Sequence, residues 1–167
     1  MHRNMLLLSI HPEHADKIFA GTKCVELRKL RPRVTKDDWV LVYASSPTKA
    51  LLGVCQVAQV IEGSPRKLWT QVRGQAGITK GRFDDYFDGI PNGFGIWLGD
   101  VKRLNVPLEL QSLRQQWANF QPPQSYKYVL PEEIQGLSEL SALVRSSVTQ
   151  GADTKIPAPM RATRTIK

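Results

Sequence analysis

Short runs of apolar residues, separated by turn residues, recur along most of the chain. Within these runs aliphatic, aromatic or β-branched residues predominate, and Gly, Pro, Asn or Asp bounds them, which predicts β-strands. The predicted strands are Met5–Ile10, Cys24–Leu30, Trp39–Ala44, Leu51–Glu62, Gly93–Leu98, Val101–Leu108 and a closing Ser125–Leu130. About six short strands at this spacing favour a small β-barrel over a β-sandwich.

Helical signals interrupt the strands. The clearest predicts a helix over residues 11–21, with Pro12 at its first position and Gly21 as a left-handed stop. Further helices are predicted over 64–72, 79–87, 110–117 and 131–144. A small barrel with short flanking helices is an α+β fold.

The charge of the chain is unevenly distributed. Its 167 residues carry a formal net charge of +8, and half of that excess lies in residues 145–167, where five basic residues stand against Asp153 alone. This segment has too few apolar residues to repay the entropy cost of ordering. We therefore expect one folded domain over residues 1–144 and a flexible basic C-terminal tail over 145–167.

Composition also limits the class of protein. Two cysteines are too few for a disulfide framework and fit a reducing compartment. The apolar run Met5–Ile10 is far too short for a signal peptide or a membrane span. His11 and His14 lie three residues apart with no third ligand nearby, so no metal site is expected. We expect a cytoplasmic protein without membrane contact and without a cofactor.

The first candidate site, directly after the first helix, is formed by Lys23, Glu26 and Arg28. Strand alternation places Val25 and Leu27 on one face and Glu26 and Arg28 on the other. Lys23 has the core-facing parity, but at the start of the strand it can reach the same site. Basic side chains bind phosphate and base edges, and a carboxylate accepts from exocyclic amines. The alternative is a salt-bridged strand on the barrel rim.

Two further groups of polar residues, each next to a predicted strand, are candidates for the same site. The first group follows the third strand at a turn: Tyr43, Ser45, Ser46 and Lys49. The second follows a stiff double proline: Gln124, Ser125 and Tyr126. Hydroxyls and an ammonium group can face an anion, whereas an amide and a ring suit base recognition and stacking. Lys29 and Arg31 add positive charge after the motif strand. Ordinary turn chemistry is the alternative for the first group.

The chain resembles the ASCH domain family, a branch of the PUA-like β-barrel superfamily. Five blocks in the expected order carry the resemblance: residues 7–13, the G-x-K-x-x-E-x-R element at 21–28, residues 42–47, Gly53, and residues 122–128. The resemblance implies a compact barrel with a cleft. Members of the family are assigned variously to RNA binding, nucleic-acid cleavage and hydrolysis of modified nucleosides.

From charge and resemblance together we expect a module that binds RNA or a nucleotide in a basic cleft, with DNA as a second candidate ligand and regulation as one role open to it. One alternative is a metal-independent ribonuclease or a modified-nucleoside hydrolase with catalytic residues among Lys23, Glu26, Tyr43, Lys49 and Ser125. The nucleoside hydrolase is disfavoured because Glu26 stands where that branch has its threonine nucleophile. Another alternative is a regulatory module for a protein partner that the sequence does not identify.

Overall fold

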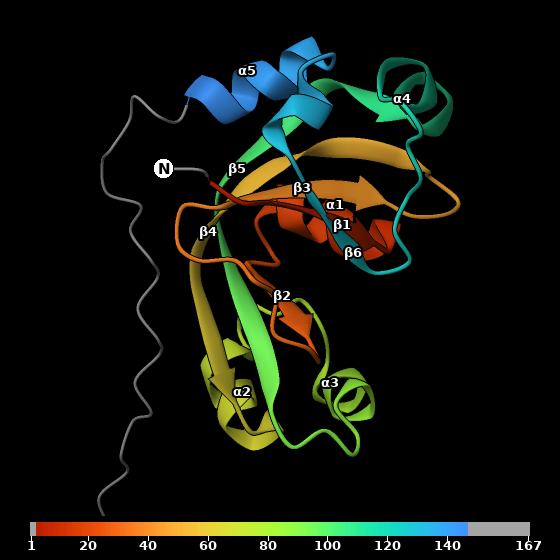
Figure 1. The fold of residues 1–167 in the computed structure, drawn as a ribbon. Helices are drawn as coiled ribbons and strands as arrows, with labels where there is room; N and C mark the ends of the chain where they lie inside the picture. The colour runs from red at the N-terminus through yellow and green to blue at the C-terminus, as the bar shows by residue number, and fades with distance from the viewer. Residues whose placement is uncertain (1–2, 147–167) are drawn as a thin grey trace, which may run out of the picture.

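The computed structural model describes residues 3–146, which form one six-stranded sheet with short helices at both ends (Figure 1). The strands are β1 (Met5–Ile10), β2 (Val25–Arg28), β3 (Trp39–Ala44), β4 (Ala50–Gly63), β5 (Gly93–Glu109) and β6 (Tyr126–Val129). Their order across the sheet is β2-β5-β4-β3-β1-β6. The sheet curls into a half-barrel in which β2 and β6 are the two edges. The predicted α+β, PUA-like fold class is confirmed.

Most of the helices lie at the two ends of the sheet. The helices are α1 (Pro12–Ala20), α2 (Pro65–Val72), α3 (Lys80–Tyr86), α4 (Leu110–Gln116), the 3-10 helix η1 (Pro131–Ile134) and α5 (Ser138–Ser146). Figure 1 shows α4 and α5 at one end of the long strands β4 and β5, and α2 and α3 at the other. The cap predicted at Gly21 is present: its φ is 80°, and its N–H donates to the carbonyl of Ile18.

Two predictions about elements were wrong. The strands predicted over 93–98 and 101–108 are one continuous strand, β5, which passes Asp100 in a left-handed conformation with φ 43°. The β4–β5 pairing absorbs the extra residues as bulges, so the chain bends without turning back. The helix predicted over 131–144 is divided into η1 and α5 by a turn over residues 135–137. There the carbonyl of Ile134 accepts hydrogen bonds from the N–H of Leu137 and from the hydroxyl of Ser141.

Strand register brings the ends of three strands together. β1 pairs with β3 in parallel, with Ser9 opposite Tyr43. β1 also pairs with β6 in antiparallel fashion, and beyond the last ladder pair the N–H of Ser9 donates to the carbonyl of Ser125 at 2.9 Å. Tyr43, Ser9 and Ser125 therefore form a row across the end of the sheet, and their common parity places them on one face.

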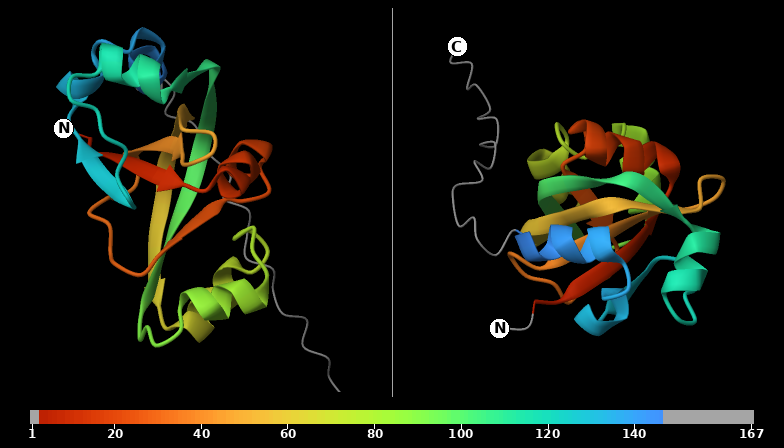
Figure 2. Two further views of the ribbon diagram at one scale, coloured as in Figure 1. Left: turned by 90° about the vertical axis from the view of Figure 1, so that its right-hand side faces the viewer. Right: turned by 90° about the horizontal axis from the view of Figure 1, so that it is seen from above.

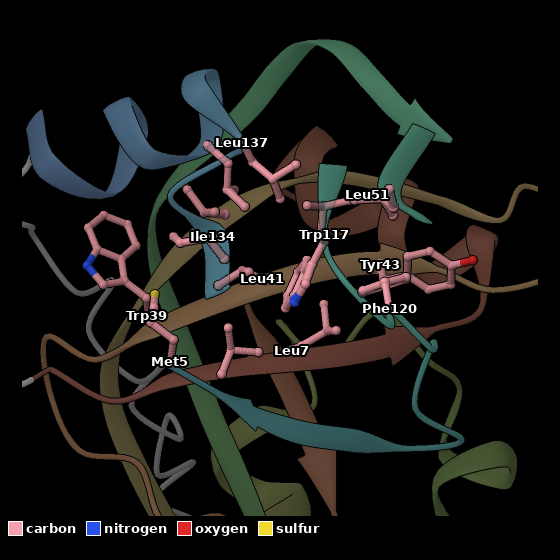
Figure 3. Packing of buried hydrophobic residues seen from close by; sticks show 14 of the residues in the cluster. Met5, Leu7, Trp39, Leu41, Tyr43, Leu51, Trp117, Phe120, Ile134 and Leu137 are labelled. Carbon is pink, nitrogen blue, oxygen red and sulfur yellow. The ribbon is translucent and has the colours of Figure 1, made fainter. Parts of the chain in front are cut away.

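Three apolar clusters stabilise this arrangement. The first covers the face of the sheet under α4, η1 and α5, and Figure 3 shows Trp39, Tyr43, Trp117 and Phe120 packed in it. The second fills the hollow of the half-barrel beneath α1, and the third lies between β2, β5, α2 and α3. Gly53 in β4 is required for close packing, because a Cβ there would lie 2.2 Å from the carbonyl oxygen of Lys102.

The tail predicted over 145–167 lies outside the described residues, except for its first two positions, which end α5. Within residues 3–146 no helix has the length and apolar character needed to cross a membrane.

Candidate functional site

The motif strand β2 is held in place by the end of α1. The backbone N–H of Lys23 donates to the carbonyl of Lys17, and the N–H of Cys24 to that of Gln75. From there the predicted alternation is present. Val25 and Leu27 pack in the cluster with α2 and α3, whereas Glu26 and Arg28 lie outside that cluster.

Glu26 joins the two basic residues of the motif. Its Oε1 accepts a hydrogen bond of 2.8 Å from Nη2 of Arg28, and its Oε2 lies 3.6 Å from Nζ of Lys23. Lys23 also donates to the carbonyl of Ala76 at 2.8 Å. All three residues are buried: Lys23 is 4% exposed, and Glu26 and Arg28 are each 8% exposed. Buried charges of this kind persist only when they are paired, and here one carboxylate serves two cations.

Burial changes the proton affinity of the motif lysine. It lowers the pKa of Lys23, and the charge of Glu26 opposes that shift. The ammonium is therefore easier to deprotonate than an exposed lysine. This places a group with altered acid–base behaviour beside a carboxylate, a combination frequent at functional sites.

Arg28 connects the two edges of the half-barrel. Its Nη1 donates to the Ser125 hydroxyl at 2.8 Å, across 97 positions of sequence, from β2 to the residue before β6. Among the described residues Nε of Arg28 is buried without a hydrogen-bond partner. Since a buried unpaired donor is costly, this N–H favours a ligand acceptor or an ordered water.

A cavity of about 250 Å³ lies against this network. The polar residues that line it are Ser9, His11, His14, Lys23, Glu26, Arg28, Arg82 and Tyr86. All three residues of the first predicted group line the cavity. Ser9 also lines it, and Ser9 belongs to the row that contains Tyr43 and Ser125. No residue of the other two groups lines it, and the link to them is the hydrogen bond from Arg28 to Ser125.

Five polar residues of this cavity were not predicted as part of the site: Ser9, His11, His14, Arg82 and Tyr86. Burial, followed by the charge of Lys23, lowers the pKa of His14. Nδ1 of His14 is buried and has no hydrogen-bond partner among the described residues. Tyr86 donates to the carbonyl of Leu27 at 3.3 Å, and burial raises its pKa. The sequence signal available for this group was the spacing of His11 and His14, which lie three residues apart directly after β1.

Tyr43 was predicted to be part of the site near the end of the third strand, but its ring belongs to the apolar core. It is 2% exposed, and its centroid lies 6.0 Å from that of Phe120 (Figure 3). Burial raises the pKa of Tyr43, so its hydroxyl keeps its proton at neutral pH. Parallel pairing nevertheless puts Tyr43 beside Ser9, and β1 lies between Tyr43 and Ser125.

The turn after β3 is mostly exposed. Ser46 and Lys49 are exposed and Ser45 is half-buried. The N–H of Lys49 donates to the carbonyl of Ser45 at 3.1 Å, so the alternative of turn chemistry holds for the backbone. None of the three lines the 250 Å³ cavity.

The remaining predicted residues lie around the edge. Gln124 is exposed, and Tyr126 packs half-buried against the apolar filling of the half-barrel. Lys29 lies over the ring of Tyr86, with 4.9 Å from Nζ to the centroid. Arg31 forms an exposed ion pair of 2.9 Å with Glu62.

A larger cavity of about 970 Å³ lies elsewhere, between the 35–38 loop, η1 and α5. Trp39 and Ile134 contribute apolar surface to it, and Arg3 and Arg145 contribute positive charge. It contains none of the predicted site residues. We regard the smaller cavity as the candidate site because the buried charge network borders it.

The sequence model of the ASCH domain matches residues 8–135, which is most of the chain. The chain belongs to the ASCH domain family. A curated relative from Zymomonas mobilis, named ASCH domain-containing ribonuclease, is 31% identical over 142 residues, covering 85% of this chain and 95% of the relative.

Solved structures agree with this family assignment. The crystal structure of the ASCH protein of Z. mobilis has a TM-score of 0.76 at 31% identity and covers 81% of this chain and 94% of that one. A tyrosine-to-phenylalanine mutant of the same protein has a TM-score of 0.77 at 30% identity, covering 83% and 99%. The N-terminal domain of McrB from Staphylothermus marinus, 15% identical with a TM-score of 0.53 over 81% and 92%, shares the fold alone.

Proposed function

We propose that this ASCH protein binds single-stranded RNA and cleaves it where Arg28 and Ser125 meet. The observation that carries the proposal is their 2.8 Å hydrogen bond, which joins the motif strand to the segment before β6 beside the Tyr43 row. The ribonuclease name of the 31% identical relative favours RNA over other phosphate ligands. Two solved mutants of the Z. mobilis protein replace a tyrosine and a serine, the two hydroxyl residue types in this row.

The chemistry that these side chains supply is attack by the 2′-hydroxyl of RNA on the adjacent phosphorus. The 2′-oxygen–phosphorus bond forms, the bond from phosphorus to the 5′-oxygen breaks, and the products carry a 2′,3′-cyclic phosphate and a 5′-hydroxyl. The 2′-hydroxyl must lose a proton, and the leaving 5′-oxygen must gain one. Extra negative charge develops on the phosphoryl oxygens between these events.

Residues that line the cavity, together with Tyr43 and Lys49 from outside it, can fill each role. Burial keeps His14 neutral, so it can accept the proton, and Tyr43 remains protonated, so it can donate one. Arg28 offers a buried N–H to the developing charge, and Lys49 adds positive charge from the turn. Glu26 holds the motif cations in place, and the 250 Å³ cavity has room for one nucleobase.

The test is cleavage of a mixed-sequence single-stranded RNA in the presence of a chelator, with mass spectrometry of the product ends. We expect 2′,3′-cyclic phosphate ends from RNA and no product from its 2′-O-methyl analogue. Tyr43→Phe and Ser125→Ala each remove one hydroxyl and should lower kcat by roughly 100-fold. Ser138→Ala, an exposed serine at the start of α5, is the matched control and should retain the wild-type rate.

Two results would overturn the proposal. One is a correctly folded wild-type protein that leaves every RNA intact. The other is cleavage that Tyr43→Phe and Ser125→Ala both retain, or that proceeds on the 2′-O-methyl strand. Binding without cleavage would instead support the RNA-binding module, and loss of binding with Arg28→Gln would still locate that module at this cavity.

A further inference from the structure

The loop that follows β2 crosses the open side of the half-barrel. At its start Arg28 bonds to Ser125, and at residue 33 the backbone N–H of Arg33 donates to the hydroxyl of Tyr128 in β6 at 2.7 Å. Figure 2 shows this segment running from β2 across to the start of β3. Residues 29–33 therefore lie along the gap between the edge strands, directly beside the candidate cleavage position.

Two cations of the loop are held over tyrosine rings. Nζ of Lys29 lies 4.9 Å from the ring centroid of Tyr86, and Cζ of Arg33 lies 4.9 Å from that of Tyr128. Both basic residues are exposed, and within residues 3–146 neither forms an ion pair with a carboxylate. A ring fixes the position of a cation without neutralising its charge.

Arg31, between them, is arranged differently. It points to Glu62, whose carboxylate lies 2.9 Å from its Nη1. The loop thus presents two uncompensated positive charges, at positions 29 and 33, separated by a compensated one. Leu30, 73% exposed, adds an apolar contact surface of the kind that ribose and base faces use.

We propose that residues 29–33 form a binding strip for the RNA backbone on one side of the cleaved bond, with Lys29 and Arg33 contacting phosphates. This proposal rests on the proposed function, because RNA is the ligand of the strip. From Ser125 to Tyr128 is three strand residues, or about 10 Å. Arg33 therefore lies beyond the reach of a dinucleotide centred on Ser125 and contacts only a longer strand.

The test measures binding of a 2′-O-methyl oligonucleotide of about twelve nucleotides, a length within the usual range of single-strand site sizes. Dissociation constants are taken between about 50 and 200 mM salt, where counterion release gives a linear log–log plot with a slope near −0.7 per phosphate contact. Arg33→Gln and Lys29→Gln should each make the slope shallower by about 0.7, and the double variant by about 1.4.

A matched control exists on another part of the sheet. Arg103 also lies over an aromatic ring, that of Phe19, at 5.1 Å, but on the stretch of β5 that pairs with Gly53. Arg103→Gln should leave the slope unchanged. Arg31→Gln should reduce it by less than Arg33→Gln, because Glu62 already compensates that charge. Dinucleotide cleavage should be indifferent to Arg33→Gln, whereas cleavage of the longer RNA should show a raised KM.

The role of the ring can be tested separately. Tyr128→Phe keeps the ring and removes only the hydroxyl that accepts from Arg33, so the salt slope should stay near wild type. Tyr128→Leu releases the guanidinium and should weaken binding several-fold. The strip is overturned if the wild-type protein binds RNA but Arg33→Gln and Lys29→Gln retain its salt slope. Absence of any RNA binding overturns the strip and the proposed function together, while binding without cleavage overturns the ribonuclease alone.

Discussion

Two groups of charged residues meet at Arg28, and they differ in their exposure to solvent. On one side Lys23, Glu26 and Arg28 itself are almost fully buried and bonded to one another. On the other side the loop cations Lys29 and Arg33 are exposed and rest on aromatic rings. The buried group is little screened by solvent, so each member depends on its bonds to the others. The exposed group is screened by salt, so its charges act additively on a polyanion.

The largest effect expected from this contrast is on stability. Glu26→Ala leaves two buried cations without their carboxylate and should lower the free energy of unfolding by about 3–5 kcal/mol in urea denaturation. Glu62→Ala breaks the exposed pair with Arg31 and should cost less than about 1 kcal/mol. Equal losses of unfolding free energy in the two variants would show that burial does not make the Glu26 network more stabilising than an exposed ion pair.

The next effect concerns pH and Lys23. Burial lowers the pKa of Lys23 in the folded state below the ordinary value of 10.5. Between that lowered pKa and pH 10.5 the unfolded chain therefore holds more protons at this group than the folded one. The contribution of Lys23 to the unfolding free energy should therefore rise with pH toward 10.5 and level off above it. The rise is at most about 1.4 kcal/mol per pH unit.

Lys23→Met removes that titration, so the variant should lose this part of the pH dependence in denaturation curves measured across the alkaline range. If the unfolding free energies of the wild type and of Lys23→Met had the same slope against pH, the pKa of Lys23 would be the same in the folded and unfolded states.

The smallest effect lies in an exposed pair on α1. Lys17 donates to Glu13 at 2.8 Å and, with help from Arg82, lowers the pKa of Glu13 to about 2. An NMR titration of the Glu13 carboxylate should show this value in the wild type. Lys17→Gln should return the pKa most of the way to 4.5, and Arg82→Gln should move it less. A larger shift with Arg82→Gln would reverse the assigned order of causes.

Local sequence was a good guide where one element decides the outcome. The Pro12 start and the Gly21 stop fixed α1, and alternation along β2 correctly separated Val25 and Leu27 from Glu26 and Arg28. These features depend on neighbouring residues along the chain. The same reasoning failed at Asp100, where a turn signal became a bulge inside β5, since pairing with β4 continued on both sides.

The structure brings the three motif residues together and places further polar residues beside them. Lys23, Glu26 and Arg28 were grouped from their spacing in one strand. His14, Arg82 and Tyr86 were missed because they reach the cavity from α1 and α3, whose approach to β2 depends on tertiary packing. Tyr43 was grouped with the turn residues after its strand, but it shares the parity of Trp39 and Leu41, and its side chain packs with theirs in the core.

The sequence by itself determined the family, the strand pattern and the charge network of the motif, because these depend on residue type and on spacings of a few positions. Only the tertiary structure decided that Arg28 meets Ser125, 97 positions away, and that the loop cations lie on Tyr86 and Tyr128. Those contacts follow from the curl of the sheet, which brings its edge strands to face each other. Curl is a collective property of six paired strands, and no local segment encodes it.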